Sequence, residues 1–235
     1  MQRMRELVCE VQAANPSDGF FATLDETLRS SSQARAIYRA YDLALYGLDL
    51  ASWHELKRKA IGHFSNHRKG QLKQGFFNQL NEAFAYQHLV RQGYREVAIL
   101  REDGKTTPDL AYYAAGSQRF CEVKTIGISD DEIAFRAAEQ SFDSTIYQDL
   151  SEGFMNKFIS VLTQAQRQIA SRGSDGLIFV VAEFDDFTLQ HYDRYREKLF
   201  RNLLEHEAQE VFVKVGLIGG RRIYKSRIIK RERDA

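Results

Sequence analysis

The sequence predicts an α/β fold of the α+β type. Its helices are expected to pack on a mixed sheet that contains both parallel and antiparallel strands. Two segments, 71–92 and 150–172, carry apolar residues at helical spacing, and a glycine follows each of them. Three short strand-like segments lie between these helices, and the continuous apolar run 177–182 follows the second one. A run of that length is typical of a strand buried on both faces of a sheet. The expected core order is therefore helix, three strands, helix, strand.

Composition and charge limit the classes of protein that fit this sequence. The 235 residues are 43% hydrophobic, which suits one large domain or a core domain with an appendage. No apolar run approaches the roughly 18 residues that span a bilayer, and the N-terminus resembles no secretory leader, so a cytoplasmic location is expected. Two distant cysteines, Cys9 and Cys121, argue against a disulfide scaffold or a cysteine zinc site. With a net charge of +1, any surface for a polyanion must come from local clusters.

Residues 1–70 are predicted to form a helical region in front of a core domain that spans 71–235. Within that domain, 71–183 is the expected core and 184–235 a C-terminal extension. Basic residues gather near the end of the helical region and in the C-terminal tail: Lys57, Arg58, Lys59, Arg68, Lys69, Arg221 and Arg222. Each cluster is either a solvated face or a surface that contacts the phosphates of a nucleic acid.

The three strands between the core helices are predicted from short segments and turn signals. Residues 95–102 form the first expected strand, and an Asp-Gly turn signal follows it. The stretch Thr106–Thr125 predicts two more strands joined by a two-residue turn at Ala115-Gly116, because glycine readily adopts positive φ. A turn of that length places Asp109 directly opposite Glu122.

A lysine follows Glu122 at the spacing that keeps two side chains on one face of a strand. Lys124 lies two residues beyond Glu122, so Asp109, Glu122 and Lys124 are expected to converge. Two carboxylates and an ammonium group suggest a divalent-cation site with a cationic helper. The alternative is an exposed ion pair of little energetic value. Phe120 and Ile126 share the same strand face, which favours a partly buried site.

This order of elements and motifs resembles the PD-(D/E)xK nuclease superfamily, whose restriction-endonuclease-like fold has an αβββαβ core. The resemblance covers about residues 71–183. It is carried by Pro108-Asp109, by Glu122-Val123-Lys124, and by Glu82 in the preceding helix. The motif is short, so the resemblance depends largely on the accompanying order of helices and strands.

The resemblance implies roles for individual residues. Asp109, Glu122 and Glu82 would bind Mg²⁺, or Mn²⁺ in its place, and the backbone carbonyl of Val123 would be a further ligand. Lys124 would position or deprotonate the attacking water and balance charge on the phosphate. Mg²⁺ prefers oxygen ligands and keeps several waters, so two or three carboxylates are sufficient.

Additional candidates lie on the second core helix and near the end of the helical region. The resemblance implies a Lys or Gln that approaches the site from the second helix, and Lys157, Gln164 and Gln168 all qualify. A polar helix face explains each of them equally well. His63 and His67 have the i, i+4 spacing of a metal pair, but without a third ligand a surface or phosphate-contacting role is favoured.

The resemblance predicts a Mg²⁺-dependent nuclease that hydrolyses phosphodiester bonds in nucleic acid, with a DNA endonuclease as the expected form. A homodimer or a partner protein would supply target recognition. One alternative is a catalytically inactive nucleic-acid-binding or assembly protein with the same fold, and another is an unrelated globular protein with an accidental motif. Residues 127–149 are expected to form a partly helical, acidic insertion.

Overall fold

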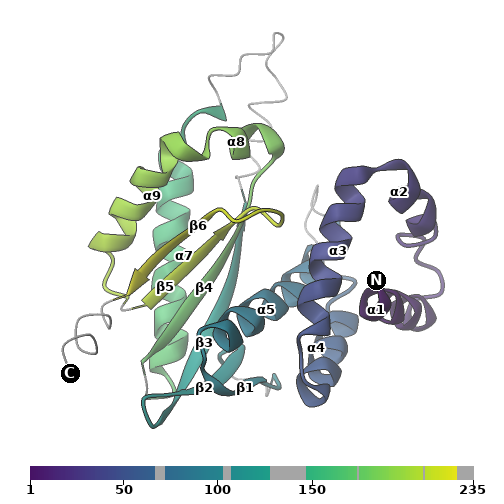
Figure 1. The fold of residues 1–235 in the computed structure, drawn as a ribbon, viewed down its shortest axis with the longest axis horizontal. Coiled ribbons are helices and arrows are strands. Elements are labelled where there is room, and N and C mark those ends of the chain that lie inside the picture. Colours follow the sequence, from purple (N-terminus) through teal and green to yellow (C-terminus); the bar gives the residue numbers. More distant parts are fainter. Residues whose placement is uncertain (67–71, 103–106, 128–146, 174, 209, 227–235) are drawn as a thin grey trace. The chain divides into compact units, whose positions relative to one another are not determined.

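The computed structural model describes residues 1–66, 72–102, 107–127, 147–173, 175–208 and 210–226 (Figure 1). The chain divides into two compact units. The first unit consists of Met1–Glu102 and Asp109–Ser117, and the second consists of Asp103–Pro108 and Gln118–Ala235. The domain boundary after residue 70 stays a prediction.

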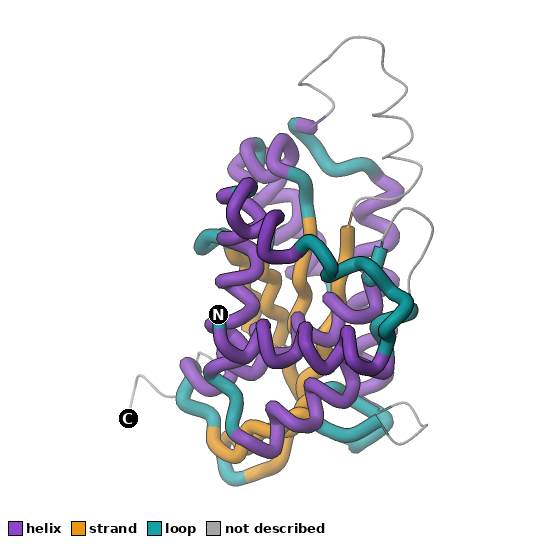
Figure 2. The backbone as a smooth tube through the Cα atoms, turned by 90° about the vertical axis from the view of Figure 1, so that its right-hand side faces the viewer, coloured by secondary structure: helices purple, strands orange, loops and turns teal. Residues whose placement is uncertain are grey.

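Helices, drawn in purple in Figure 2, make up most of the described part of the first unit. Five described helices precede its first strand along the chain. They are α1 (Gln2–Ala14), α2 (Leu24–Ser30), α3 (Ser32–Tyr46), α4 (Leu50–Gly62) and α5 (Gln74–Arg91). Two of them begin at side-chain caps: Ser31 accepts a hydrogen bond from the Ala34 amide, and Asp49 accepts one from the Ser52 amide. Such caps satisfy backbone donors that the first turn of a helix leaves unpaired.

Aromatic side chains form part of the core of the first unit. Ring centroids in this cluster lie between 4.9 and 6.3 Å apart. Its members are Phe20, Phe21, Phe64, Phe76 and Phe77. Phe76 belongs to α5, which packs against both α3 and α4. The buried face of α5 also carries Asn81 and Glu82, so polar groups enter an otherwise apolar core.

The first unit ends in a pair of strands and the predicted tight turn. Strand β1 (Arg95–Ile99) pairs antiparallel with β2 (Leu110–Ala114). Asp109 lies immediately before β2, and its carbonyl accepts a hydrogen bond from the Leu100 amide at 2.8 Å. After β2, Ala115 and Gly116 have φ values of 50° and 79°. Two consecutive positive φ angles are typical of a two-residue hairpin turn, so the prediction at this position is confirmed.

The sheet has six strands in the order β1-β2-β3-β4-β5-β6. In the second unit, β3 (Ser117–Gly127) is parallel to β4 (Gly176–Glu183), and β4 is parallel to β5 (Glu210–Val215). Strand β6 (Arg222–Ser226) pairs antiparallel with β5. This mixture of parallel and antiparallel pairs confirms the mixed α/β fold class.

Helices α7 (Glu152–Ala170) and α9 (Tyr192–Glu205) pack on the strands of the second unit (Figure 1), and the short helix α8 (Asp186–Gln190) precedes α9. Phe158 and Leu162 of α7 share one apolar cluster with Ile178 and Val180 of β4. The run 177–182 is buried at every position, as predicted. Strand β4 begins very close to β3: a Cβ atom at Gly176 would lie 1.9 Å from the Phe120 carbonyl oxygen.

Several predictions fall on residues that the structure does not describe. His67, Arg68 and Lys69 are among them, and so is most of the predicted insertion at 127–149. Among the described residues, none of the helices combines the length and the apolar character needed to cross a membrane.

Candidate active site

The four residues that carry the nuclease resemblance are divided between the two units. Glu82 and Asp109 belong to the first unit, whereas Glu122 and Lys124 belong to the second. In each unit, a lysine ammonium group contacts the acidic side chains.

In the first unit, the cation beside the predicted metal ligands is Lys59 of α4. Its Nζ donates a hydrogen bond to Glu82 Oε1 at 2.5 Å and lies 3.8 Å from Asp109 Oδ1. Glu102 Oε1 is 4.0 Å from the same nitrogen. The side chains of Lys59 and Glu82 are only 1% and 3% exposed. The structure therefore brings Glu82 and Asp109 to one ammonium group.

Burial and charge act in opposite directions on this ion pair. Burial works to lower the pKa of Lys59, but the nearby carboxylates, led by Glu82, raise the pKa above its ordinary value. Burial also raises the pKa of Glu82, and Lys59 is the opposing charge that favours its carboxylate form. Leaving either charge buried without the other would be costly, so the pair depends on both members.

The two oxygens of Glu82 have different surroundings. Oε1 contacts Lys59, whereas Oε2 is buried and accepts no hydrogen bond from the described residues. Buried polar atoms in folded proteins are nearly always paired, so such an oxygen suits a cation ligand. In the described part of the chain, no three His, Cys, Asp or Glu side chains form a group that could hold a metal ion.

A second set of contacts joins Glu102 to His63, for which the sequence predicts a surface or phosphate-contacting role. The Asn66 amide nitrogen lies 2.8 Å from His63 Nδ1, and His63 Nε2 lies 3.2 Å from Glu102 Oε2. An amide nitrogen only donates, so Nδ1 accepts and Nε2 carries the hydrogen towards Glu102. These contacts engage both ring nitrogens of His63 with other side chains of the first unit.

In the second unit, Glu122 and Lys124 lie on the same face of β3, next to an apolar cluster. Phe120 and Ile126, on that face, pack into the cluster beneath α7. Lys124 Nζ lies 2.7 Å from Glu122 Oε1, and the two side chains are 19% and 3% exposed. The pair is therefore not the exposed ion pair of the alternative interpretation.

Helix α7 contributes one of its three candidate residues to this pair. Lys124 Nζ donates a hydrogen bond to Gln168 Oε1 at 2.6 Å. Lys157 instead donates to the carbonyl of Gly127 at 3.3 Å, and Gln164 is exposed. The structure thus selects Gln168 as the residue of α7 that contacts the predicted catalytic lysine.

Two predicted phosphate-binding residues of the first unit already contact carboxylates. Lys57 Nζ lies 2.9 Å from Glu6 Oε1 and 2.6 Å from Glu10 Oε1. Arg58 Nη2 lies 2.5 Å from Glu55 Oε1 on the same helix. A nucleic acid would have to compete with these carboxylates, so the basic sequence of this segment overstates its free positive charge.

The two tail residues predicted to bind substrate, Arg221 and Arg222, contribute backbone hydrogen bonds. The carbonyl of Arg221 accepts from the Val215 amide at 3.0 Å, and the carbonyl of Arg222 accepts from the Tyr192 hydroxyl at 3.0 Å. Both contacts tie the start of β6, or the residue just before it, to the rest of the second unit. A role of their guanidinium groups in substrate binding stays a prediction.

In the sequence, Lys59 stands out only as part of a basic cluster with Lys57 and Arg58. On α4, however, Trp53, Leu56 and Ala60 are buried, and Lys59 lies on the same helical face. The apolar spacing was thus the signal that distinguishes it from Lys57 and Arg58. A lysine on an apolar helix face requires a buried anionic partner, and Glu82 is that partner.

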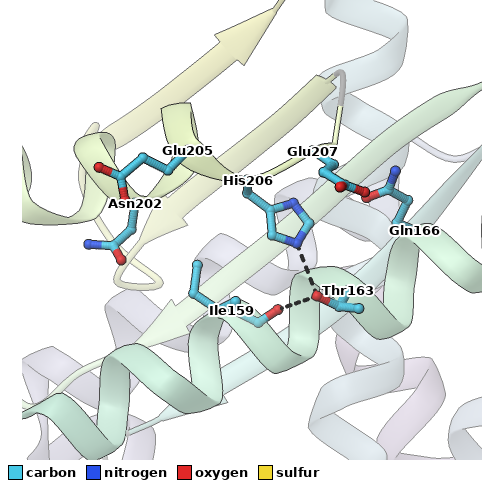
Figure 3. Close-up of a pocket in the computed structure, with 7 residues that line it drawn as sticks. All are labelled: Ile159, Thr163, Gln166, Asn202, Glu205, His206 and Glu207. Carbon is cyan, nitrogen blue, oxygen red and sulfur yellow. Dashed lines mark hydrogen bonds between the residues drawn. The ribbon is translucent and has the colours of Figure 1, made fainter.

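A separate pocket of about 470 Å³ opens between α7 and α9 (Figure 3). Its lining residues are Ile159, Thr163, Gln166, Asn202, Glu205, His206 and Glu207. The Thr163 hydroxyl donates to the Ile159 carbonyl at 3.0 Å, and His206 Nε2 lies 3.1 Å from the hydroxyl oxygen. The Ala208 amide donates to His206 Nδ1 at 3.1 Å, which fixes the neutral tautomer. None of the predicted catalytic residues lines this pocket.

Comparisons with protein-family models, with curated proteins and with solved structures find no match to this chain. The chemistry of the two groups of side chains is therefore the basis for assigning a function.

Proposed function

We propose that the protein is a Mg²⁺-dependent nuclease that hydrolyses phosphodiester bonds in nucleic acid, acting in the cytoplasm as a DNA endonuclease. Glu82, Asp109 and Glu122 would supply carboxylate ligands, together with the carbonyl of Val123. Mn²⁺ would substitute for Mg²⁺, since both accept oxygen ligands. Among the described residues, the element order α5-β1-β2-β3-α7-β4 supports this proposal because it repeats the helix and strand order of an αβββαβ core.

The observation that carries the proposal is the buried carboxylate of Glu122 beside Lys124. Removing a carboxylate and an ammonium group from water costs several kcal/mol for each ion, which an apolar pair at the same positions would avoid. The buried pair also lies in the (D/E)xK spacing, and an α7 side chain contacts it. Strongly desolvated charges next to a specific partner are a feature of functional sites.

Lys124 has the hydrogen-bonding capacity that its proposed role requires. An ammonium group has three N–H donors, and Glu122 and Gln168 accept two of them. The third can donate to a phosphate oxygen or to the attacking water. A bound divalent ion would polarise the phosphoryl oxygen and lower the pKa of a water ligand. Lys124 would then orient that water and stabilise the charge that develops on the phosphate.

The hairpin turn supports the proposal that Asp109 and Glu122 share one ion. A two-residue turn at Ala115-Gly116 places the residues before and after it in antiparallel register, provided that no bulge intervenes. Asp109 and Glu122 are equally distant from the centre of that turn. Glu82 would join them from α5, where Lys59 already places it near Asp109.

The decisive experiment measures Mg²⁺-dependent cleavage of plasmid and single-stranded DNA by the full chain. We expect Asp109→Ala and Lys124→Ala to abolish cleavage, and EDTA to abolish it in the unchanged protein. Lys198→Ala is the matched control, because this lysine forms a surface ion pair with Asp149 at 3.1 Å. Cleavage that persists in both site variants, or that is absent from the unchanged protein, contradicts the proposal.

The same experiment separates the proposal from a binding or assembly protein. A binding protein would retard DNA in a gel, with strong dependence on salt, and would leave the DNA intact. The occupied charges of Lys57 and Arg58 limit the basic surface available for such binding in the described part of the first unit. An accidental motif would give neither retardation nor cleavage.

A further inference from the structure

Lys59 is a buried cation with no part in the proposed cleavage reaction. Helix α4 directs it away from solvent, on the face that carries Leu56 and Ala60. Its side chain is 1% exposed, so it cannot reach the phosphate of a substrate that approaches from solvent. Its contacts are instead with carboxylates of the first unit.

The contact between Lys59 and Glu82 distinguishes the two oxygens of the carboxylate. Lys59 Nζ donates a hydrogen bond to Glu82 Oε1 at 2.5 Å. Oε2 lies buried and accepts no hydrogen bond from any described residue. An ammonium group on one oxygen fixes the rotation of the carboxylate and therefore the direction of the other oxygen.

We propose that Lys59 is a positioning residue for the metal site: it holds Glu82 through Oε1 and thereby presents Oε2 to the divalent ion. This inference rests on the proposed function, because it assumes that Glu82 is a metal ligand. Asp109 Oδ1 lies 3.8 Å from the same nitrogen, beyond hydrogen-bonding distance, so Glu82 is the ligand that Lys59 holds. Lys59 does not contact the reacting atoms, so it differs in role from Lys124.

Two opposing effects decide whether removing Lys59 weakens or strengthens metal binding. Outer groups that hydrogen-bond to metal ligands orient them, and losing such a group typically weakens metal binding by about 10- to 100-fold. A positive charge near a divalent ion instead repels it, so a competing lysine would weaken binding in the unchanged protein. Positioning predicts that removal of Lys59 weakens binding, and competition predicts that removal strengthens it.

The test is Mn²⁺ binding to the full chain, measured by calorimetry and by the paramagnetic resonance signal of free Mn²⁺. We expect Lys59→Met to weaken binding by about 10- to 100-fold. Lys73→Met is the matched control, because Lys73 is also a buried lysine of the first unit and is paired with Asp18. The control should bind Mn²⁺ like the unchanged protein. Equal or tighter binding by Lys59→Met overturns the inference.

A double-variant cycle separates positioning from a general structural effect. If Lys59 acts through Glu82, adding Lys59→Met to Glu82→Gln should weaken Mn²⁺ binding by less than about threefold further. A full additional loss would show that Lys59 acts independently of Glu82, which overturns the inference. Should Lys59→Met alone fail to fold, Lys59→Gln retains a donor for Oε1. It should bind Mn²⁺ three- to tenfold more weakly, on the order of a partly retained contact, and unchanged affinity would overturn the inference.

The metal measurement also distinguishes this inference from the proposed function. If the unchanged protein binds no Mn²⁺, both fail. If it binds Mn²⁺ and Lys59→Met binds equally well, only the positioning role fails. If Lys59→Met loses affinity but the unchanged protein cleaves no nucleic acid, the positioning role stands and the nuclease activity fails.

Discussion

Two lysine–glutamate pairs, one in each unit, use the same chemical groups in different surroundings. Lys59 and Glu82 join two helices and are almost completely buried. Lys124 and Glu122 lie on one strand, and Lys124 keeps about a fifth of its side chain exposed. An ammonium group that is sealed from solvent can orient its partner, whereas one that reaches solvent can also meet a substrate. Exposure of the lysine, and not the identity of the pair, separates the two proposed roles.

The largest expected effect is on catalysis, and it concerns the exposed pair. Lys124→Ala should lower the Mg²⁺-dependent cleavage rate by about 10²- to 10⁴-fold, as expected for the loss of a positioned acid–base group. The measurement is the initial rate of plasmid nicking at saturating Mg²⁺. A loss smaller than about fivefold would place Lys124 outside the chemistry and remove the contrast between the pairs.

The second effect is on stability, and it concerns the buried pair. Lys59→Met should lower the free energy of unfolding by about 3–5 kcal/mol, because Glu82 would remain buried without its counter-charge. Lys124→Ala also leaves a buried glutamate, Glu122, without its counter-charge, but the Lys124 side chain is 19% exposed and water can enter its site, so the cost should be smaller, about 1–3 kcal/mol. Urea unfolding of both variants checks the difference. A double variant, Lys59→Met with Glu82→Leu, should recover most of the lost stability, and equal costs for the two lysines would break the comparison.

A smaller effect concerns the glutamine that holds the exposed lysine. Gln168→Ala should lower the cleavage rate by roughly tenfold, because Lys124 loses one hydrogen bond that fixes its direction. Gln166→Ala, on the same helix, is the control, since Gln166 lines the separate pocket. If both variants cleave at the rate of the unchanged protein, the contact of Gln168 with Lys124 has no catalytic value.

The smallest expected effect is on the pH dependence of stability. It concerns His206, which belongs to neither lysine–glutamate pair. Burial, with a contribution from the charge of Lys225, lowers the pKa of His206 below its ordinary value. The folded protein therefore favours the neutral ring, so stability is complete above the unfolded pKa of about 6.5 and is lost as the pH falls below it. His206→Asn, which keeps an acceptor for the Ala208 amide, should lose less stability than the unchanged protein between pH 7.5 and 5.5. If the urea midpoints of the two proteins fall by the same amount between pH 7.5 and 5.5, the lowered pKa of His206 is contradicted.

Local patterns predicted several features that the structure confirms. The two positive φ angles at Ala115 and Gly116 follow from a turn signal within the hairpin itself. The burial of residues 177–182 follows from their continuous apolar character. Periodicity could not choose among Lys157, Gln164 and Gln168, because it assigns a helix face but not the side chain that meets it across a packing contact.

Which residues share a strand face follows from the sequence alone. Glu122 and Lys124 lie together because side chains alternate along a strand, whatever packs against it. The groups that neutralise the buried charges, in contrast, are set by how distant parts of the chain pack together. Lys59 meets Glu82 across 23 residues of sequence, and Lys124 meets Gln168 across 44. Such contacts depend on how helices pack, and local backbone geometry does not encode that arrangement.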